Sequence, residues 1–238
     1  MEHIEGKSQS NPSVNRRDPR LYHIASLGTL LAYGLFWLHF DLSLWQIAVT
    51  IGTALLTQYA GTRYAKLPCF DPKSALISSL SLCILLRTDH LAIAALASVV
   101  AIGSKFVFRW NDKHLFNPTN LALAIALASG MGWISPGQWG QVAWFGFLIA
   151  CLGSLVVTRA ARADVTFAFL AVYVSLLFAR ALWLGDPLTI PFHQIESGAL
   201  LIFAFFMISD PKTTPDSRAG RIVYALCVAL AALYVQFG

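Results

Sequence analysis

Charged residues are scarce in this chain of 238 residues. Asp, Glu, Lys and Arg make up 12% of it, whereas hydrophobic residues make up 57% and the mean hydropathy is +0.63. A soluble domain carries about 25% charged residues, so this chain has too little charge to cover the surface of a soluble globule. The same composition excludes a disordered chain, a collagen, a coiled coil and a disulfide-stapled secreted scaffold. It indicates an integral membrane protein.

Motifs of common catalytic and metal sites are absent as well. The four cysteines are far apart and form no C-x-x-C pair, so their spacing supports neither a zinc site nor an iron–sulfur cluster. The sequence contains no G-x-S-x-G, H-E-x-x-H, Walker A or G-x-G-x-x-G pattern. We therefore predict no metal site. Hydrolase, metalloprotease and nucleotide-binding functions gain no support, and the sequence alone assigns no enzymatic reaction.

Long apolar runs dominate the rest of the sequence. A membrane-spanning helix needs about 20 mostly apolar residues. Nine segments approach this length, at about 21–40, 43–61, 74–87, 90–106, 118–134, 138–157, 164–184, 193–209 and 219–236. The third is short for a straight crossing and the fifth contains Gly130 and Gly132, so each is a candidate for a broken or re-entrant helix. The prediction is an all-α polytopic membrane protein with about nine transmembrane segments.

The chain divides into a polar tail and one membrane domain. Residues 1–20 are predicted to form a disordered cytoplasmic tail, and residues 21–238 a single transmembrane domain with halves at 21–134 and 138–238. Lys and Arg are retained on the cytoplasmic side of short loops. With the N-terminus inside, 15 of the 17 Lys and Arg lie on that side, and only Arg87 and Arg180 lie outside. We therefore predict a cytoplasmic N-terminus, an external C-terminus and no nucleic-acid partner.

Two polar loops on the predicted cytoplasmic side stand out in this apolar chain. In the loop 104–120, Asn117 is a favourable N-cap and Pro118 suits the first helical position. A helix that begins there and points into the membrane presents free N–H groups and a positive dipole end to an anion or a polar ring. The loop 205–221 has a similar Asp210-Pro211 turn, after which Asp210 or Thr214 can cap the next helix. Simple helix capping is the alternative interpretation of both loops.

The two loops supply the candidate cofactor-binding residues. They share polar or basic side chains beside a predicted helix end. They are Lys105, Arg109, Lys113, His114, Asn117, Thr119, Asp210, Thr213 and Thr214.

Four blocks of the sequence carry a resemblance to a known family. They are Lys113–Pro118, Ser197–Ala199, Phe205–Pro211 and Arg218–Arg221. In this order they resemble the RnfD/NqrB membrane subunits of bacterial flavin-containing, ion-translocating electron-transport complexes. The chain is also similar to shorter stand-alone relatives found near enediyne biosynthesis loci. The resemblance implies a bacterial inner-membrane protein with a urea-transporter-like inverted repeat, here with the last helix missing.

One departure from the family concerns its flavin. The family attaches FMN to the threonine of a Ser/Thr-Gly-Ala-Thr motif, and no Gly-Ala-Thr occurs in this chain. The nearest string, Ser197–Leu200, ends in a residue without a hydroxyl group. Covalent FMN is therefore not expected, whereas a noncovalent flavin or quinone stays open.

Three functions remain open at this stage. The first is a redox-linked electron-transport or ion-translocation subunit, whose electrons must come from another membrane or redox subunit. The second is a channel or transporter for a small solute on the same scaffold. The third is a non-catalytic membrane anchor for a biosynthetic or electron-transfer partner. A scaffold hosts many functions, so the fold alone does not separate these.

Overall fold

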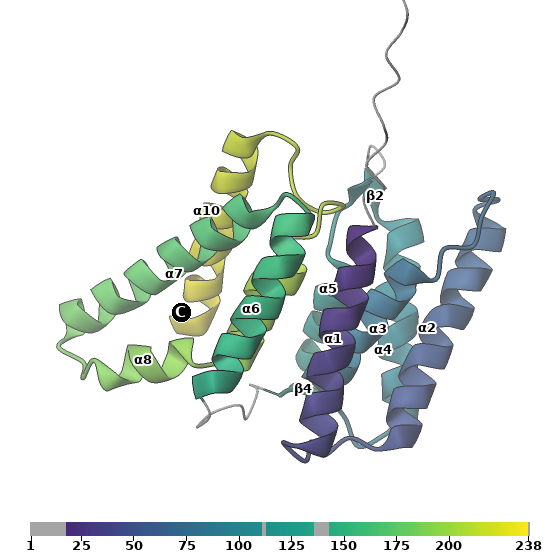
Figure 1. Ribbon diagram of the computed structural model, residues 1–238, viewed down its shortest axis with the longest axis horizontal. Helices are drawn as coiled ribbons and strands as arrows, with labels where there is room; N and C mark the ends of the chain where they lie inside the picture. The colour runs from purple at the N-terminus through teal and green to yellow at the C-terminus, as the bar shows by residue number, and fades with distance from the viewer. Residues whose placement is uncertain (1–17, 111–112, 136–142, 238) are drawn as a thin grey trace, which may run out of the picture.

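The computed structural model describes residues 18–110, 113–135 and 143–237, which are mostly helical (Figure 1). The helices are α1 Pro19–Phe36, α2 Leu44–Tyr64, α3 Lys73–Leu85, α4 Leu91–Val107, α5 Pro118–Ala128, α6 Ala143–Arg159, α7 Ala163–Leu184, α8 Thr189–Ile195, α9 Gly198–Ile202 and α10 Arg218–Phe237. Helix α9 continues directly into a π-helix, η1 Phe203–Met207. Four strands of two residues each, β1 Leu86–Arg87, β2 Arg109–Trp110, β3 Lys113–His114 and β4 Trp133–Ile134, complete the described elements.

Helices occupy each of the nine predicted segments, so the predicted all-α class is confirmed, but nine crossings are not. By length and composition, α7 and α10 are able to cross a membrane. Helix α8 together with α9 and η1 forms a third candidate, bent by 51° at the break between them. The predicted tail falls almost entirely outside the described residues, and α1 begins at Pro19, where the Asp18 side chain accepts a hydrogen bond from the backbone N–H of Arg20 at 3.0 Å.

Helices α3 and α5 are each too short to cross a bilayer. At 1.5 Å per residue, α3 and α5, with 13 and 11 residues, are about 20 and 17 Å long, whereas the hydrocarbon layer is about 30 Å thick. Each is followed by a strand, and these strands, β1 and β4, pair antiparallel. Gly130 adopts a positive φ of 67°, and a Cβ atom at Gly132 would lie 2.9 Å from the carbonyl oxygen of Arg87. The predicted third and fifth segments are therefore short helices that end in a strand pair.

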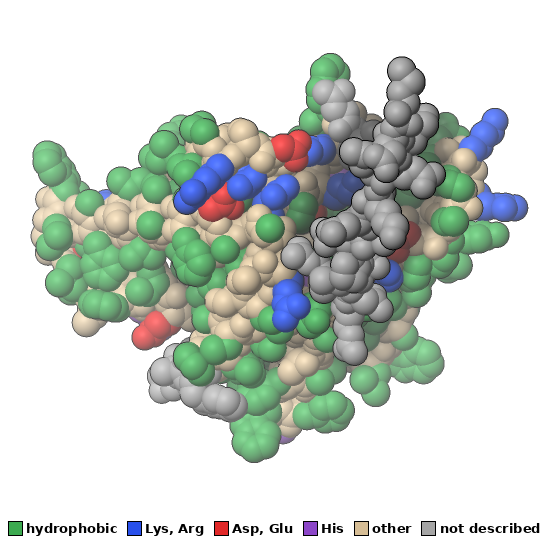
Figure 2. Space-filling view, turned by 45° about the horizontal axis from the view of Figure 1, so that its top comes forward, with side chains coloured by type: hydrophobic (Ala, Val, Ile, Leu, Met, Phe, Trp, Pro, Cys, Tyr) green, Lys and Arg blue, Asp and Glu red, His purple; other side chains and the backbone are tan. Residues whose placement is uncertain are grey.

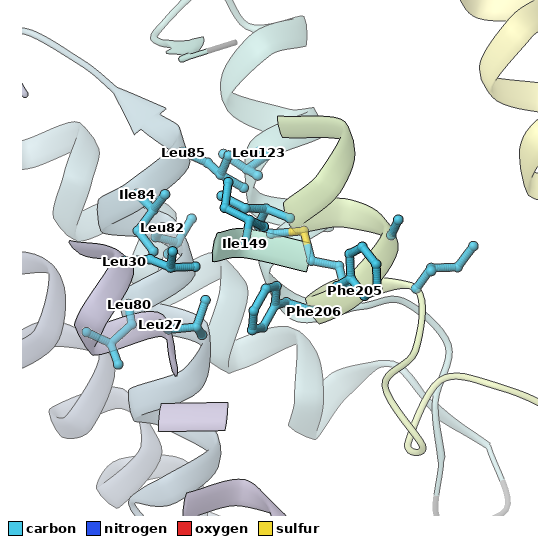
Figure 3. Packing of buried hydrophobic residues seen from close by; sticks show 14 of the residues in the cluster. Leu27, Leu30, Leu80, Leu82, Ile84, Leu85, Leu123, Ile149, Phe205 and Phe206 are labelled. Atoms are coloured by element: carbon cyan, nitrogen blue, oxygen red, sulfur yellow. The ribbon is translucent and has the colours of Figure 1, made fainter. Parts of the chain in front are cut away.

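The helices pack in two groups. In the first, α3 lies against α1 and α2, while α4 lies against α2 and α5; in the second, α6 packs on α9 and η1, and α7 packs on α10. Helices α1 and α6 join the groups. Buried apolar side chains from both groups meet there, including Leu30 of α1, Leu82 of α3, Ile149 of α6 and Phe206 of η1 (Figure 3). The core thus lies between the two halves of the chain.

The helix ends that the sequence assigns to the cytoplasm lie at one end of the molecule. Lys73, at the start of α3, donates from Nζ to Asp18 at 2.7 Å, so α1 and α3 begin side by side. Lys105, near the end of α4, donates from Nζ to Ser74 Oγ at 3.0 Å. The grouping of these ends agrees with the Lys and Arg pattern. That this end faces the cytoplasm stays a prediction.

Close packing between α6 and η1 gives a first test of the fold. A Cβ atom at Gly153 of α6 would lie 2.5 Å from Cβ and Cγ of Phe205 in η1. We expect Gly153→Ala to lower the free energy of unfolding by about 1–3 kcal/mol, because overpacking forces the neighbour to move. The measurement is the unfolding midpoint of the purified protein in detergent. Gly28→Ala is the matched control, since nothing lies within 4 Å of a Cβ atom there; equal losses for both variants would contradict the packing.

Candidate functional site

The two predicted polar loops meet through Asn117. Its Oδ1 accepts a hydrogen bond from the backbone N–H of Asn120 at 3.2 Å, which confirms the predicted N-cap, and Pro118 occupies the first turn of α5. Its Nδ2 donates to the carbonyl oxygen of Met207, the last residue of η1, at 3.3 Å. One side chain therefore both caps α5 and holds the end of η1 beside it.

A second link joins the same loops through strand β3. The backbone N–H of His114 donates to the carbonyl oxygen of Lys212 at 3.0 Å. The Nζ of Lys113 donates to the carbonyl oxygen of Thr214 at 2.7 Å and to Oδ1 of Asp216 at 2.6 Å. Strand β3 also pairs with β2, which places Arg109 opposite His114. The structure thus brings Lys113, His114 and Asn117 against the loop after η1.

Asp210 organises that loop through its own backbone and side chain. Its Oδ1 accepts a hydrogen bond from the N–H of Lys212 at 2.9 Å. Its carbonyl oxygen accepts hydrogen bonds from the backbone N–H and the hydroxyl groups of Thr213 and Thr214, at 3.0–3.2 Å. The expected capping of the next helix by Asp210 or Thr214 is wrong, because Ser217 Oγ accepts from Gly220 N–H at 3.1 Å at the start of α10. The Asp210 carboxylate accepts from Lys212 instead, and the Thr214 hydroxyl group bonds with Asp210 and Arg162.

Lys105 and Thr119 lie deeper than the other candidates. Lys105 is 5% exposed and Thr119 is 3% exposed. The hydroxyl of Thr119 donates to the carbonyl oxygen of Ser78 at 3.4 Å, which ties α5 to α3. Within the described ranges, no carboxylate oxygen lies within 4 Å of the Lys105 ammonium, which donates to Ser74. Lys105 is therefore a nearly buried cation at the N-terminus of α3.

The loop residues carry shifted pKa values. Burial lowers the pKa of His114 to about 4, and the positive charges of Lys105, Arg109 and Lys212 act in the same direction. Burial raises the pKa of Asp210, although the N–H of Lys212 and the charge of Lys105 oppose this shift. The hydrogen bond from Lys113 lowers the pKa of Asp216. The centre of the cluster is therefore positively charged, with a neutral histidine beside it.

Four further residues hold this end together, and no local signal in the sequence marked them as a group. Arg221 of α10 donates from Nε and Nη2 to Oδ2 of Asp164 in α7 at 2.8 and 2.6 Å, and from Nη1 to the carbonyl oxygen of Asp216 at 2.6 Å. Arg162 donates from Nε to Thr214 Oγ1 at 3.3 Å. Figure 2 shows Lys and Arg side chains, with acidic ones among them, gathered on this end. For Arg162 and Arg221, the sequence pattern of Lys and Arg predicted only the side of the membrane on which they lie.

A cavity lies at the opposite end of the molecule from these loops. Its volume is about 500 Å³, and its lining comes from the turn before α2, the start of α2, the β1–β4 pair and the start of α4. None of the nine candidate residues lines it. The sequence signal that marks this cavity is Arg87, one of the two basic residues outside the predicted cytoplasmic set. Within the described part of the chain, no group of three or more His, Cys, Asp or Glu side chains is arranged to hold a metal ion.

Sequence comparisons place the second half of the chain in a known context. The sequence model of the NQR2, RnfD, RnfE family matches residues 126–237. This match confirms, over just under half of the chain, the resemblance that the short motifs indicated. It includes helices α6 to α10 and the loop of Asp210.

Curated relatives agree with the family match. The chain is 35% identical over 105 residues to a subunit of the ion-translocating oxidoreductase complex of Erwinia tasmaniensis, and the match covers 43% of this chain and 27% of the relative. The corresponding subunits from Alcanivorax borkumensis and Escherichia coli are each 33% identical, over 43% and 47% of this chain and 28% and 30% of their own lengths. The matched region thus spans less than a third of the relatives' length.

The double role of Asn117 gives a test of the link between the loops. Asn117→Ala removes both an N-cap and a hydrogen bond to Met207, so we expect it to lower the free energy of unfolding by about 2 kcal/mol. Ser43→Ala is the control, because its side chain, within the described residues, only caps α2 by accepting from Gln46 N–H at 3.0 Å. Its expected cost is about 1 kcal/mol. Chemical unfolding in detergent measures both, and a larger loss for Ser43→Ala would exclude the double role.

The lowered pKa of His114 predicts a pH dependence of stability. The unfolded chain binds a proton at this residue near pH 6.5, whereas the folded chain does so near pH 4. The free energy that neutral His114 contributes to folding is therefore fully present above pH 6.5 and is lost as the pH falls toward 4. We expect His114→Gln to flatten the fall of the unfolding temperature over this window. His193→Gln, at a side chain that is 85% exposed, is the control; identical profiles for His114→Gln and the original protein would rule out the shift.

Proposed function

Because residues 126–237 match the NQR2, RnfD, RnfE family, we propose that this protein is a membrane subunit of a bacterial ion-translocating electron-transport complex. Its relatives are named as subunits of an ion-translocating oxidoreductase complex. The location that follows is the bacterial inner membrane, with other membrane and redox subunits as partners. The observation that carries the proposal is that the matched half contains η1 and the Asp210 loop, which hold the start of α5.

The proposed architecture is an inverted repeat of nine segments. Helix α1 packs on α3 as α6 packs on α9 and η1, and α2 packs on α4 as α7 packs on α10. The directions are opposite, since α1 begins at the end of the molecule where α6 ends. In this arrangement the short α3 corresponds to α9–η1, which is bent by 51° relative to α8; inverted repeats commonly place such broken elements around a central site. The N-terminus then faces the cytoplasm and the C-terminus the outside.

The proposed ligand site is the positively charged cluster at the meeting point of the loops. An ammonium group has three N–H donors, and Lys105 uses one of them on Ser74. The remaining donors and the positive charges of Arg109 and Lys212 near His114 fit an anionic or polar group. A noncovalent flavin or a quinone would supply one-electron chemistry there. Asn117 and Asp210 keep the two loops in place around it.

Purification from bacterial membranes tests the proposal. The full chain, tagged and extracted in mild detergent, should carry other redox subunits in fixed ratio and show a flavin absorption band or yield an extractable quinone. Lys105→Met should reduce the amount of bound cofactor several-fold while the subunits still co-purify, because it removes a buried cation without touching the outer surface.

Lys66→Met is the matched control, because it alters an exposed lysine, and it should leave cofactor content unchanged. A colourless chain without partner subunits that passes a neutral solute across liposome membranes would replace this proposal with the channel function. A colourless chain held by a partner of another kind would replace it with the anchor function.

A further inference from the structure

Polar side chains contribute to the lining of the cavity of about 500 Å³, which lies at the end of the molecule opposite the two polar loops. Strand β1 pairs with β4 in a register that sets Arg87 opposite Trp133, and Thr88 Oγ1 donates to the carbonyl oxygen of Met131 at 3.2 Å. Its volume lies within the range of about 300–1,000 Å³ that is usual for small-molecule sites. Backbone pairing therefore fixes the side of the cavity formed by β1 and β4.

Arg87 points to a ligand because its guanidinium group is buried and incompletely paired. The side chain is 7% exposed. Its Nη1 donates to the carbonyl oxygens of Cys83 and Leu86 at 3.1 and 3.0 Å, and its charge lies 5.0 Å from the centre of the Phe40 ring. Its Nη2 is buried and has no hydrogen-bond partner among the described residues. Within the described residues, no carboxylate oxygen lies within 4 Å of this guanidinium group. A buried cation without a close anion is costly, so an anionic group that enters the cavity beside Arg87 is favoured.

The charges around the cavity define the rest of the ligand. Two exposed acidic side chains, Asp41 and Asp89, line it together with Arg87. A ligand that is only anionic meets two carboxylates for one guanidinium group, and a ligand that is only cationic meets the buried Arg87. A ligand with one group of each sign satisfies all three. The indole rings of Trp45 and Trp133 in the lining add faces that attract a cation.

We propose that this outer cavity binds a phosphoethanolamine group, with the phosphate at Arg87 and the ammonium beside Asp41 and Asp89. Phosphate oxygens accept charge-assisted hydrogen bonds from guanidinium groups, and a primary ammonium group donates to carboxylates.

The position of the cavity suits a phospholipid as the source of this group. Trp37 and Trp45, at the ends of α1 and α2 nearest the cavity, are 72% and 76% exposed. Exposed tryptophans are typical of the membrane–water interface. Leu44, which is 77% exposed beside Trp45, offers apolar surface for an acyl chain. A soluble phosphoethanolamine is the other source with the same chemistry.

Lipid binding to the delipidated full chain tests the proposal. Native mass spectrometry and thermal shifts compare dioleoyl phosphatidylethanolamine, dioleoyl phosphatidylglycerol and free O-phosphoethanolamine. We expect the ethanolamine lipid to bind at least about tenfold more tightly than the glycerol lipid, and Arg87→Gln to weaken it by about tenfold or more, because a charge-assisted hydrogen bond is lost. Asp41→Asn, at an exposed side chain that forms no salt bridge with another described residue, should weaken it about threefold by the loss of one ammonium partner.

Controls separate binding from folding. Arg180→Gln alters the other outer arginine, which lies 3.7 Å from Asp186 and stacks on Phe237, and should leave binding unchanged. Arg87→Lys keeps the charge but not the second donor nitrogen, so it should fold and still bind more weakly. Competition by O-phosphoethanolamine would assign the soluble source, and its failure would assign the lipid. Equal binding of both lipids, no binding of either, or full binding by Arg87→Gln would overturn the proposal.

Discussion

The hydrogen bond from the Asn117 side chain to the Met207 carbonyl oxygen is the contact on which the arrangement of the two halves depends. A π-helix ends at Met207, whose carbonyl oxygen accepts hydrogen bonds from the backbone N–H of Asp210 and from the Asn117 side chain, each at 3.3 Å. The Oδ1 of the same asparagine caps α5. One amide side chain therefore holds the end of η1 in the second half beside the start of α5 in the first, and buried apolar side chains of α1 and α6 pack between the same halves.

Electrostatics at the same end explain why acidic residues lie there. The N-termini of α3 and α5 carry positive partial charge, and the nearly buried Lys105 donates to Ser74 at the start of α3. Without acidic residues nearby, the positive helix ends and the Lys105 ammonium group would repel one another. The charges of Asp210 and Asp71 act on Lys105 in the stabilising direction, although neither reaches salt-bridge distance. The balance is incomplete, which is why a positively charged centre remains available for an anionic group.

Local signals in the sequence predicted the helices and the two loops, but not how the loops are fastened. The apolar runs predicted the positions of the nine segments, because a helix that is buried or faces lipid needs apolar side chains. The glycines of the fifth segment and the length of the third indicated where helices end early. The pairing of Asp164 with Arg221 joins residues 57 positions apart, and no local pattern encodes that separation. Arg87 was visible only as an exception to the Lys and Arg rule, since its strand pairs with β4, which lies beyond α5 in the chain, and no local pattern encodes that pairing.

The two ends of the molecule differ in how far their polar side chains are paired, and this difference favours different roles for the two ends. At the loop end, hydrogen bonds within the chain already engage Lys113, Asn117 and the threonines after Asp210. Most of the predicted cofactor-binding residues therefore hold the two loops together. A ligand there gains mainly from Lys105 and the charge around it. The exception among the loop residues is His114, whose Nδ1 is buried without a hydrogen-bond partner among the described residues. At the other end, the buried Arg87 lines a cavity, and no carboxylate oxygen of the described residues lies within 4 Å of its guanidinium group. A network in which most groups are paired favours a fixed joint between the halves, whereas a buried cation beside a cavity favours binding of an anionic group.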